Sequence, residues 1–263
     1  MKKKLAVGTI IGILIISMIT LIRCHSLQTE NVDLSQYFKN ANGCFVLLDS
    51  SNNKYSVFNK DMANNRISPF STFKILNALI GLETGVVEDE NTTFKWNGKK
   101  YQIDTWNGDQ TLDSAIKNSV VWYFQILAKD VGNEKMKFYI NKVGYGNCDI
   151  SGGIDKFWLN SSLKISPMEQ VEFLKKFHDL ELPFKAQNIK IVQKIIFISQ
   201  IGNSKLYGKT GSEDGKQAWF IGYIENSGKT YYFATFMNGS NNIDGTSAKT
   251  VTTNILNDMG LIN

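Results

Sequence analysis

The four residues Ser71–Lys74 place a hydroxyl and an amine three positions apart, directly before an apolar run from Ile75 to Leu82. That run predicts a buried helix, and residues three positions apart lie on the same helix face. Ser71 at the helix start would therefore face Lys74 one turn later. A serine becomes an activated nucleophile when a neighbouring neutral amine can take its proton.

The setting of Lys74 separates it from other lysines that follow a serine at this spacing. The spacing occurs three more times, at Ser51/Lys54, Ser114/Lys117 and Ser161/Lys164. Those lysines lie in polar or turn-like stretches or at the polar end of a helix, where a capping serine and a solvated lysine explain the pattern. Lys74 instead has Phe73 before it and almost only apolar residues after it. Burial there would lower the pKa of Lys74, because desolvation disfavours the charged form.

The two histidines, His25 and His178, exclude several other chemistries. A zinc site of the His-Glu-x-x-His kind is impossible, and we expect no metal. A Ser-His-Asp triad would have to use His178, which is expected in the last turn of an amphipathic helix, where the helix dipole favours it. The base of a hydrolase with this sequence is therefore expected to be a lysine or a carboxylate.

Residues 1–26 are predicted to be a signal peptide or an N-terminal membrane segment. Lys2–Lys4 form a positive n-region, and Leu5–Ile22 is almost wholly apolar. Cleavage after Ser26 fits this pattern. Cys24 resembles a lipoprotein cysteine, although Arg23 stands where a small residue is expected, and an apolar run of about 18 residues can also remain as a membrane anchor. The sequence therefore predicts an exported protein that meets a membrane only through this segment.

Residues 27–263 are expected to form one catalytic domain. Its lysines are interleaved with acidic residues and the net charge is +5, so a solvated surface is favoured over nucleic-acid binding. Cys44 and Cys148 are expected to be free, because two distant cysteines do not make a disulfide framework. The sequence leaves the oligomeric state open.

The elements that would position the reactive residues change type along the chain. Strands are predicted at residues 44–48, 55–58, 205–211, 218–224 and 231–237, and helices at 71–84, 112–131 with a break near Asn118–Ser119, 134–143, 167–180, 189–201 and 246–259. Strands at both ends with helices between them predict an α/β (α+β) fold. Its central antiparallel sheet would be built from both chain ends, flanked by helices and with an inserted helical lobe.

Four motifs occur in a fixed order along these elements, namely Ser71–Lys74, Ser119–Val121, Tyr145–Asn147 and Lys209–Gly211. Each alone is common, but their joint order resembles a class D β-lactamase, the oxacillinase-type branch of the penicillin-recognising serine enzymes. The resemblance covers about residues 40–262 and includes Ser71–Gly85 and Phe157–Leu159. It implies the serine β-lactamase and transpeptidase-like fold.

The resemblance also implies a mechanism for hydrolysing β-lactam antibiotics. Ser71 would form an acyl-enzyme, with the backbone N–H groups of Ser71 and Ser212 as the oxyanion hole. Lys74 would react with carbon dioxide to give the carboxylated lysine that serves as general base, and no other cofactor is implied. Ser119 would relay a proton to the leaving nitrogen. Trp158 would donate its indole N–H to the carboxylated Lys74, since indole can only donate.

The remaining site residues implied by the resemblance surround these groups. The pocket of the lysine would be walled by Trp158 together with Phe73, Val121, Phe124 and Leu159. Lys209 would supply positive charge near Ser119 and the substrate carboxylate. Thr210, Gly211, Ser212 and Lys249 would contact the substrate. The family usually places an arginine at the start of the C-terminal helix, and here Lys249 offers a point charge without the planar fork of arginine. The Tyr145–Asn147 turn is expected to shape the site without taking part in the chemistry.

Two other functions share the same motifs. A β-lactam sensor domain would be acylated at Ser71 without turnover, but full receptors carry several membrane helices and a His-Glu-x-x-His protease motif, and this sequence has one apolar segment and no such motif. A cell-wall transpeptidase or carboxypeptidase would share the Ser-x-x-Lys and Lys-Thr-Gly elements without the pocket at Trp158. Counting the product molecules released per protein distinguishes these functions.

Overall fold

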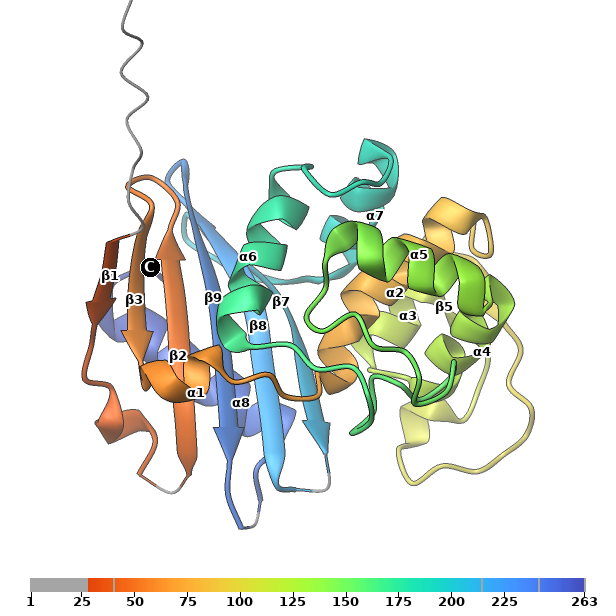
Figure 1. The fold of residues 1–263 in the computed structure, drawn as a ribbon, viewed down its shortest axis with the longest axis horizontal. Coiled ribbons are helices and arrows are strands. Elements are labelled where there is room, and N and C mark those ends of the chain that lie inside the picture. The colour runs from red at the N-terminus through yellow and green to blue at the C-terminus, as the bar shows by residue number, and fades with distance from the viewer. Residues whose placement is uncertain (1–27, 40, 214, 241, 263) are drawn as a thin grey trace, which may run out of the picture.

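A seven-stranded sheet forms the centre of the molecule, with helices on both faces and a lobe of helices at one end (Figure 1). The computed structural model describes residues 28–39, 41–213, 215–240 and 242–262. The strands lie in the order β1-β3-β2-β9-β8-β7-β6. Their bounds are β1 Gln28–Asn31, β2 Asn42–Asp49, β3 Lys54–Phe58, β6 Phe197–Ile201, β7 Ser204–Glu213, β8 Gln217–Asn226 and β9 Lys229–Asn238.

The sheet joins both ends of the chain, as predicted, because β2 pairs with β9 along its whole length. The pairings are antiparallel except that β1 runs parallel to β3, so the sheet is mixed and the prediction of a wholly antiparallel sheet was wrong in this detail. The sequence analysis did not predict β1, and its four residues are all exposed. Two further short strands, β4 (Thr93–Phe94) and β5 (Gln110–Thr111), pair in the helical lobe.

A helix forms at each predicted position, but one is shorter than predicted and α1 was not predicted. They are α1 Lys60–Asn64, α2 Lys74–Thr84, α3 Leu112–Lys117, α4 Val121–Val131, α5 Asn133–Val143, α6 Pro167–His178, α7 Ala186–Ile195 and α8 Gly245–Asp258, with short 3-10 turns at η1 Ser35–Tyr37, η2 Phe70–Phe73 and η3 Asp104–Trp106. Ser166 caps α6 in a capping box with Glu169, and Gly85 ends α2 in the left-handed conformation, as the local sequence signals indicate.

The predicted helix over residues 189–201 was wrong in its second half. The α-helix α7 ends at Ile195, and Phe197–Ile201 form β6, the edge strand paired with β7. The apolar spacing Ile189, Val192 and Ile195 is helical, and the isoleucines that follow continue an apolar pattern that fits either structure. Pairing with β7, which the local pattern does not contain, selects the strand.

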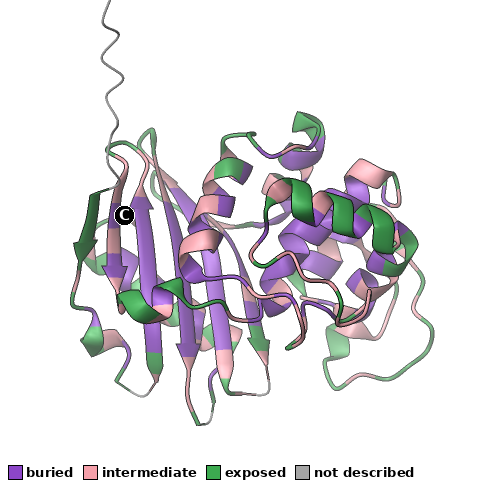
Figure 2. Ribbon diagram, viewed as in Figure 1, coloured by how far each residue is buried: buried purple, intermediate pink, exposed green. Residues whose placement is uncertain are grey.

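Two hydrophobic cores occupy the two faces of the sheet, and both are buried throughout (Figure 2). The larger core lies between the sheet, α6 and the helical lobe and holds residues from α2, α4 and α7. The smaller core lies under α8 and includes Phe220, Ile255 and Leu256. Among the described residues, no helix combines the length and apolar character needed to cross a bilayer. The predicted N-terminal segment, residues 1–26, lies outside them.

Candidate active site

The predicted nucleophile lies in a tight turn where the helical lobe meets the sheet. Ser71 belongs to the 3-10 turn η2 that precedes α2, so it stands just before the α-helix that the sequence predicted it would start. Lys74 is the first residue of α2, and its Nζ lies 2.6 Å from Ser71 Oγ. Phe70, directly before Ser71, has φ +49°, which is rare for a bulky residue. The turn thus holds a strained residue directly before the serine, and such strain is concentrated at functional sites.

Ser119 lies between two lysines from different parts of the chain. It occupies the break between α3 and α4 and has φ +57°. Its Oγ lies 3.2 Å from Lys74 Nζ and 3.0 Å from Lys209 Nζ, and its carbonyl oxygen accepts a hydrogen bond from Lys74 at 2.8 Å. The structure therefore brings together Ser71, Lys74, Ser119 and Lys209, four residues spread over 138 positions of sequence, counted as 209 − 71. The arrangement can move a proton along a continuous path of hydroxyl and amine groups.

Both lysines are buried, and burial changes their protonation. Desolvation lowers the pKa of Lys74 well below its usual value, and the positive charge of Lys209 lowers it further. Burial also lowers the pKa of Lys209, to about 7. Like charges this close disfavour protonation of both amines at once. Lys74, whose pKa is lowered both by burial and by the charge of Lys209, is the amine available to accept the proton of Ser71.

Lys74 is fully buried beside an aromatic cluster. Lys74 Nζ lies 5.6 Å from the centre of the Phe124 ring, and the Trp158 ring stacks on Phe73 with centroids 5.5 Å apart. Val121, the first residue of α4, and Leu159, which packs against the core, are half-buried. Phe73, Phe124 and Trp158 are fully buried.

The indole N–H of Trp158 is a buried donor with no hydrogen-bond partner among the described residues. Such a group costs free energy unless an acceptor reaches it, on the order of 1–3 kcal/mol. A carboxylated Lys74 would place an anionic acceptor in this pocket, so the donor, the neutral amine and the apolar walls fit that modification. The lowered pKa of Lys74, the apolar walls of its pocket and the unpaired indole N–H of Trp158 therefore fit a carboxylated lysine at this position.

Strand β7 forms the opposite wall of the site. Lys209 is buried, Thr210 half-buried and Ser212 exposed at the end of the strand. Gly211 lies against the nucleophile turn, where an added Cβ would come within 2.9 Å of the Pro69 carbonyl oxygen and 3.1 Å of the Ser71 backbone nitrogen. Only glycine permits this approach, which brings the Ser71 N–H next to the strand that carries Ser212. The arrangement is consistent with an oxyanion hole built from a turn and a strand edge.

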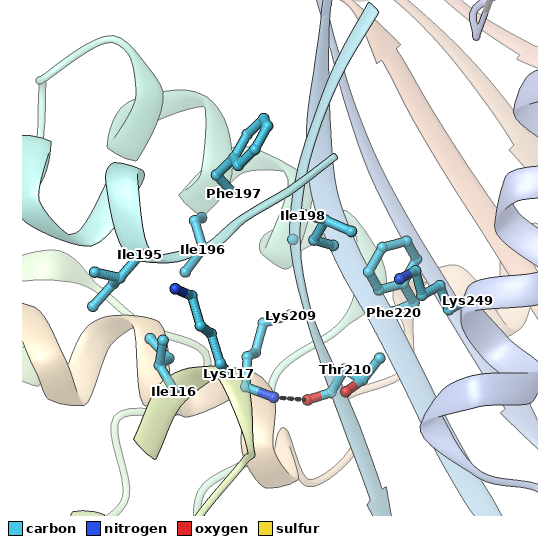
Figure 3. A pocket seen from close by; sticks show the side chains of 11 residues that line it. Ile116, Lys117, Ile195, Ile196, Phe197, Ile198, Lys209, Thr210, Phe220 and Lys249 are labelled. Atoms are coloured by element: carbon cyan, nitrogen blue, oxygen red, sulfur yellow. Dashed lines mark hydrogen bonds between the residues drawn. The ribbon is translucent and has the colours of Figure 1, made fainter. Parts of the chain in front are cut away.

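A cavity of about 330 Å³ adjoins Lys209 (Figure 3). Its walls combine cationic and apolar side chains, namely Lys117, Lys209, Lys249, Ile116, Ile195, Ile196, Phe197, Ile198 and Phe220, with Gly208 and Thr210 of β7. Lys117 reaches it from α3 and pairs with Asp113 at 2.8 Å. Lys249 reaches it from α8 and lies across β7 from Lys117 (Figure 3). The structure thus places Lys249 in one cavity with Lys209 and Thr210.

The sequence analysis did not single out two buried polar residues beside the nucleophile, Thr72 and Gln170. Thr72 lies within the Ser-x-x-Lys motif itself. Gln170 lies on the apolar face of α6 with Leu174 and Phe177, and a glutamine at a core-facing helical position is the signal that could have found it.

Other reactive side chains lie elsewhere. His178 ends α6, as predicted, and its ring nitrogens lie 2.9 Å from Asp179 and 3.3 Å from Glu225. His178 also pairs with the Tyr232 hydroxyl, whereas Ser71 pairs with Lys74, so the site is built around a lysine. Cys44 and Cys148 are free, as predicted. Over the described ranges, no group of three or more His, Cys, Asp or Glu residues is arranged to hold a metal ion.

Comparison with known proteins places the chain in a family. Residues 40–257 match the model of the penicillin binding protein transpeptidase domain. "Probable beta-lactamase YbxI" of Bacillus subtilis is 43% identical over 238 residues, which cover 90% of this chain and 88% of that protein. A crystal structure of a class D β-lactamase from Bacillus subtilis superposes with a TM-score of 0.85 at 44% identity, covering 88% of this chain and 97% of that one.

A sensor domain has the same fold. The C-terminal domain of the Bacillus licheniformis BlaR penicillin-receptor superposes with a TM-score of 0.86 at 37% identity, covering 90% of this chain and 98% of that domain. The fold alone therefore does not separate enzyme from sensor, while the higher identity and near full-length match to named β-lactamases favour the enzyme. The chain belongs to the penicillin-binding transpeptidase-domain family and, within it, to the class D β-lactamases, which are serine hydrolases.

Proposed function

We propose that this protein hydrolyses β-lactam antibiotics such as penicillins through an acyl-enzyme on Ser71, and so confers resistance to them. The observation that carries the proposal is the 2.6 Å approach of Lys74 Nζ to Ser71 Oγ inside a buried pocket that keeps the amine neutral. A neutral amine at this distance can take the hydroxyl proton while Ser71 Oγ attacks the lactam carbonyl. The attack opens the four-membered ring and leaves an ester on Ser71.

The groups around Ser71 have distinct roles in this proposal. The backbone N–H groups of Ser71 and Ser212 stabilise the carbonyl oxygen as it becomes negative. Ser119, between Lys74 and Lys209, delivers a proton to the lactam nitrogen as the C–N bond breaks. Lys209, Thr210 and Lys249 supply positive charge and a hydroxyl donor for the substrate carboxylate.

The second half of the cycle requires water to reach the ester. Carboxylated Lys74 would supply the general base that activates this water. Trp158 contributes a fixed indole N–H that holds the negative charge of the modified lysine, and Phe73 and Phe124 keep bulk water away from it. The buried donor at Trp158 is the feature that favours turnover over a sensor that stays acylated.

Replacing Ser71 by alanine tests the assignment. Ser71→Ala should abolish both penicillin turnover and covalent labelling by a fluorescent penicillin, because no other group can form the ester. Labelling is followed on the intact protein by mass spectrometry. The control is Ser51→Ala, which removes an exposed serine that also lies three residues before a lysine, Lys54. A penicillin adduct that persists in Ser71→Ala and maps to another serine would contradict the proposal.

We further propose that residues 1–26 direct export, so that the enzyme meets its substrate outside the cytoplasm. The positive n-region and the apolar run Leu5–Ile22 support this reading. Expression of the whole chain, followed by mass measurement of the exported product, should give a protein that begins after Ser26. A product that retains residue 1, or one that carries lipid on Cys24, would replace cleavage by anchoring.

A further inference from the structure

A chain of hydrogen bonds runs through the core from the Tyr145–Asn147 turn to the nucleophile turn. The Tyr145 hydroxyl donates to Gln170 Oε1 at 3.3 Å, and Gln170 Nε2 donates to Thr72 Oγ1 at 2.9 Å. Thr72 Oγ1 then donates to the Pro69 carbonyl oxygen at 2.7 Å. Three side chains from separate segments of the sequence thus end on one backbone oxygen, two residues before Ser71.

All three side chains are buried, and each has a defined direction as donor and acceptor. Thr72 and Gln170 are 0% exposed and Tyr145 is 1% exposed. Burial raises the pKa of the Tyr145 hydroxyl, which keeps it protonated as a donor. In such surroundings water cannot replace a lost partner, so each bond in the chain restricts the next. The Tyr145 ring also packs edge-on against Phe73, within the Ser-x-x-Lys motif.

The last hydrogen bond of this series, from Thr72 to the Pro69 carbonyl oxygen, holds the most constrained backbone in the site. Pro69 precedes Phe70, whose φ of +49° would relax if the carbonyl of Pro69 were free to rotate. The same oxygen faces Gly211, as does the Ser71 backbone nitrogen, so the position of the turn relative to β7 sets the geometry of the oxyanion hole. The Phe70 N–H donates to the Trp158 carbonyl at 3.0 Å, which ties the turn to the lysine pocket as well.

We propose that Gln170 is a positioning residue for acylation: through Thr72 it holds the Pro69 carbonyl, and hence the strained turn of Ser71, at the distance from β7 that the oxyanion hole requires. Tyr145 fixes the amide of Gln170 in the orientation that donates to Thr72. The proposal rests on the proposed β-lactamase function and assigns a physical task to the Tyr145–Asn147 motif, which the acyl-transfer chemistry does not itself use.

The test separates the rate of acylation from binding and from stability. Labelling of the protein by a fluorescent penicillin is followed over a range of penicillin concentrations. This gives the first-order acylation rate and the dissociation constant separately. Gln170→Leu should lower the acylation rate about 10- to 100-fold with little change in the dissociation constant, since misplacing a reacting group by about 1 Å can cost 100-fold. Tyr145→Phe should have a smaller effect in the same direction.

A pair of substitutions at Thr72 isolates the hydroxyl. Thr72→Val keeps the shape and removes the bond to Pro69, so it should slow acylation, whereas Thr72→Ser keeps the bond and should restore the rate. The control is Thr252→Val, which breaks another buried hydroxyl pair, 2.6 Å from Thr235 Oγ1 under α8. It should lower the melting temperature by a similar amount and leave acylation unchanged.

The outcomes distinguish this proposal from the one on which it rests. Acylation at the normal rate per folded molecule in both Gln170→Leu and Thr72→Val would mean that these hydrogen bonds only stabilise the fold, which overturns the positioning role. If Gln170→Leu does not fold, the comparison of Thr72→Val with Thr72→Ser decides the matter alone. Failure of the unsubstituted protein to be labelled at all would instead overturn the proposed function.

Discussion

The two buried lysines of the site differ in what surrounds them, although they share one hydroxyl group. Lys74 is fully buried with its Nζ over the Phe124 ring, and among the described residues the nearby Phe73–Trp158 stack carries a buried indole N–H without a hydrogen-bond partner. Lys209 borders a cavity of about 330 Å³ that also receives Lys117 and Lys249. Lys74 therefore lies among apolar side chains, whereas Lys209 borders a cavity lined by two further lysines.

This difference gives the two amines different roles in the site. In the closed pocket the charged form of lysine is strongly disfavoured, so Lys74 can act as a base or react with carbon dioxide. Beside the cavity, the pKa of Lys209 falls to about 7, and an anionic substrate would favour its charged form again. Residue type alone does not determine the role of a lysine in this site. The side chains around each lysine determine its role.

Removing the indole N–H should have the largest effect. Trp158→Phe keeps a ring against Phe73 but would leave the proposed carboxylated Lys74 without a buried donor, which favours loss of carbon dioxide. Deacylation should slow about 10²- to 10⁴-fold, the usual contribution of a general base. Intact-protein mass spectrometry should show a penicillin adduct that outlasts that of the unsubstituted enzyme. Trp96→Phe, which removes an indole bonded to the Lys99 carbonyl in the lobe, is the control. Normal turnover without an adduct would mean that Trp158 only packs.

Acid and bicarbonate should alter the closed pocket reversibly. Acidification should protonate the Lys74 amine and reverse the proposed carboxylation, so turnover measured at about pH 5 should fall at least about tenfold. Returning to pH 8 with added bicarbonate should restore turnover faster than pH 8 alone. Carbon-13 bicarbonate should give a carbamate NMR signal that is absent from Lys74→Ala. Full activity without bicarbonate after acid treatment, together with no carbamate signal, would contradict carboxylation.

The buried charge of Lys209 should cost stability in a pH-dependent way. The pKa of Lys209 is about 7 in the fold, against 10.5 for an unperturbed lysine, so below pH 7 both folded and unfolded chains hold the proton and the full cost of burying the ammonium is present. Between pH 7 and 10.5 the unfolded chain binds the extra proton, so stability rises with pH. Lys209→Met should therefore increase the free energy of unfolding most below pH 7, by an amount on the order of 3–5 kcal/mol that shrinks toward pH 10.

Urea unfolding at pH 6 and at pH 9.5 measures this difference. Lys205→Met, which removes an exposed lysine from the same strand, is the matched control. The expected change lies in the difference between the two pH values, because the lost hydrogen bond to Ser119 affects both alike. A gain that is equal at both pH values would show that the charge of Lys209 is already compensated in the fold.

The same contrast explains how much of the site the sequence could predict. Ser71, Lys74, Ser119 and Lys209 belong to short motifs whose order identifies the family, and the apolar run after Lys74 predicts its burial. The sequence missed the short helix α1 and went wrong where a partner distant in sequence decides the structure: residues 197–201 form strand β6 and not the predicted helix, and β1 pairs parallel to β3. Thr72 and Gln170 were missed for the same reason, since their bond joins residues 98 positions apart.

The smallest expected effect concerns the open side of the comparison. Lys249→Ala should raise KM for benzylpenicillin about two- to fivefold with kcat nearly unchanged, because a partly exposed point charge contributes modest binding that the transition state shares with the ground state. Lys249→Arg should recover or improve KM, since its planar fork suits a carboxylate. Lys117→Ala is the control within the same cavity: its ammonium already pairs with Asp113, so its loss should change KM less. Equal effects of the two alanine substitutions would mean that the cavity acts through its overall positive potential, and that Lys249 has no place of its own in substrate binding.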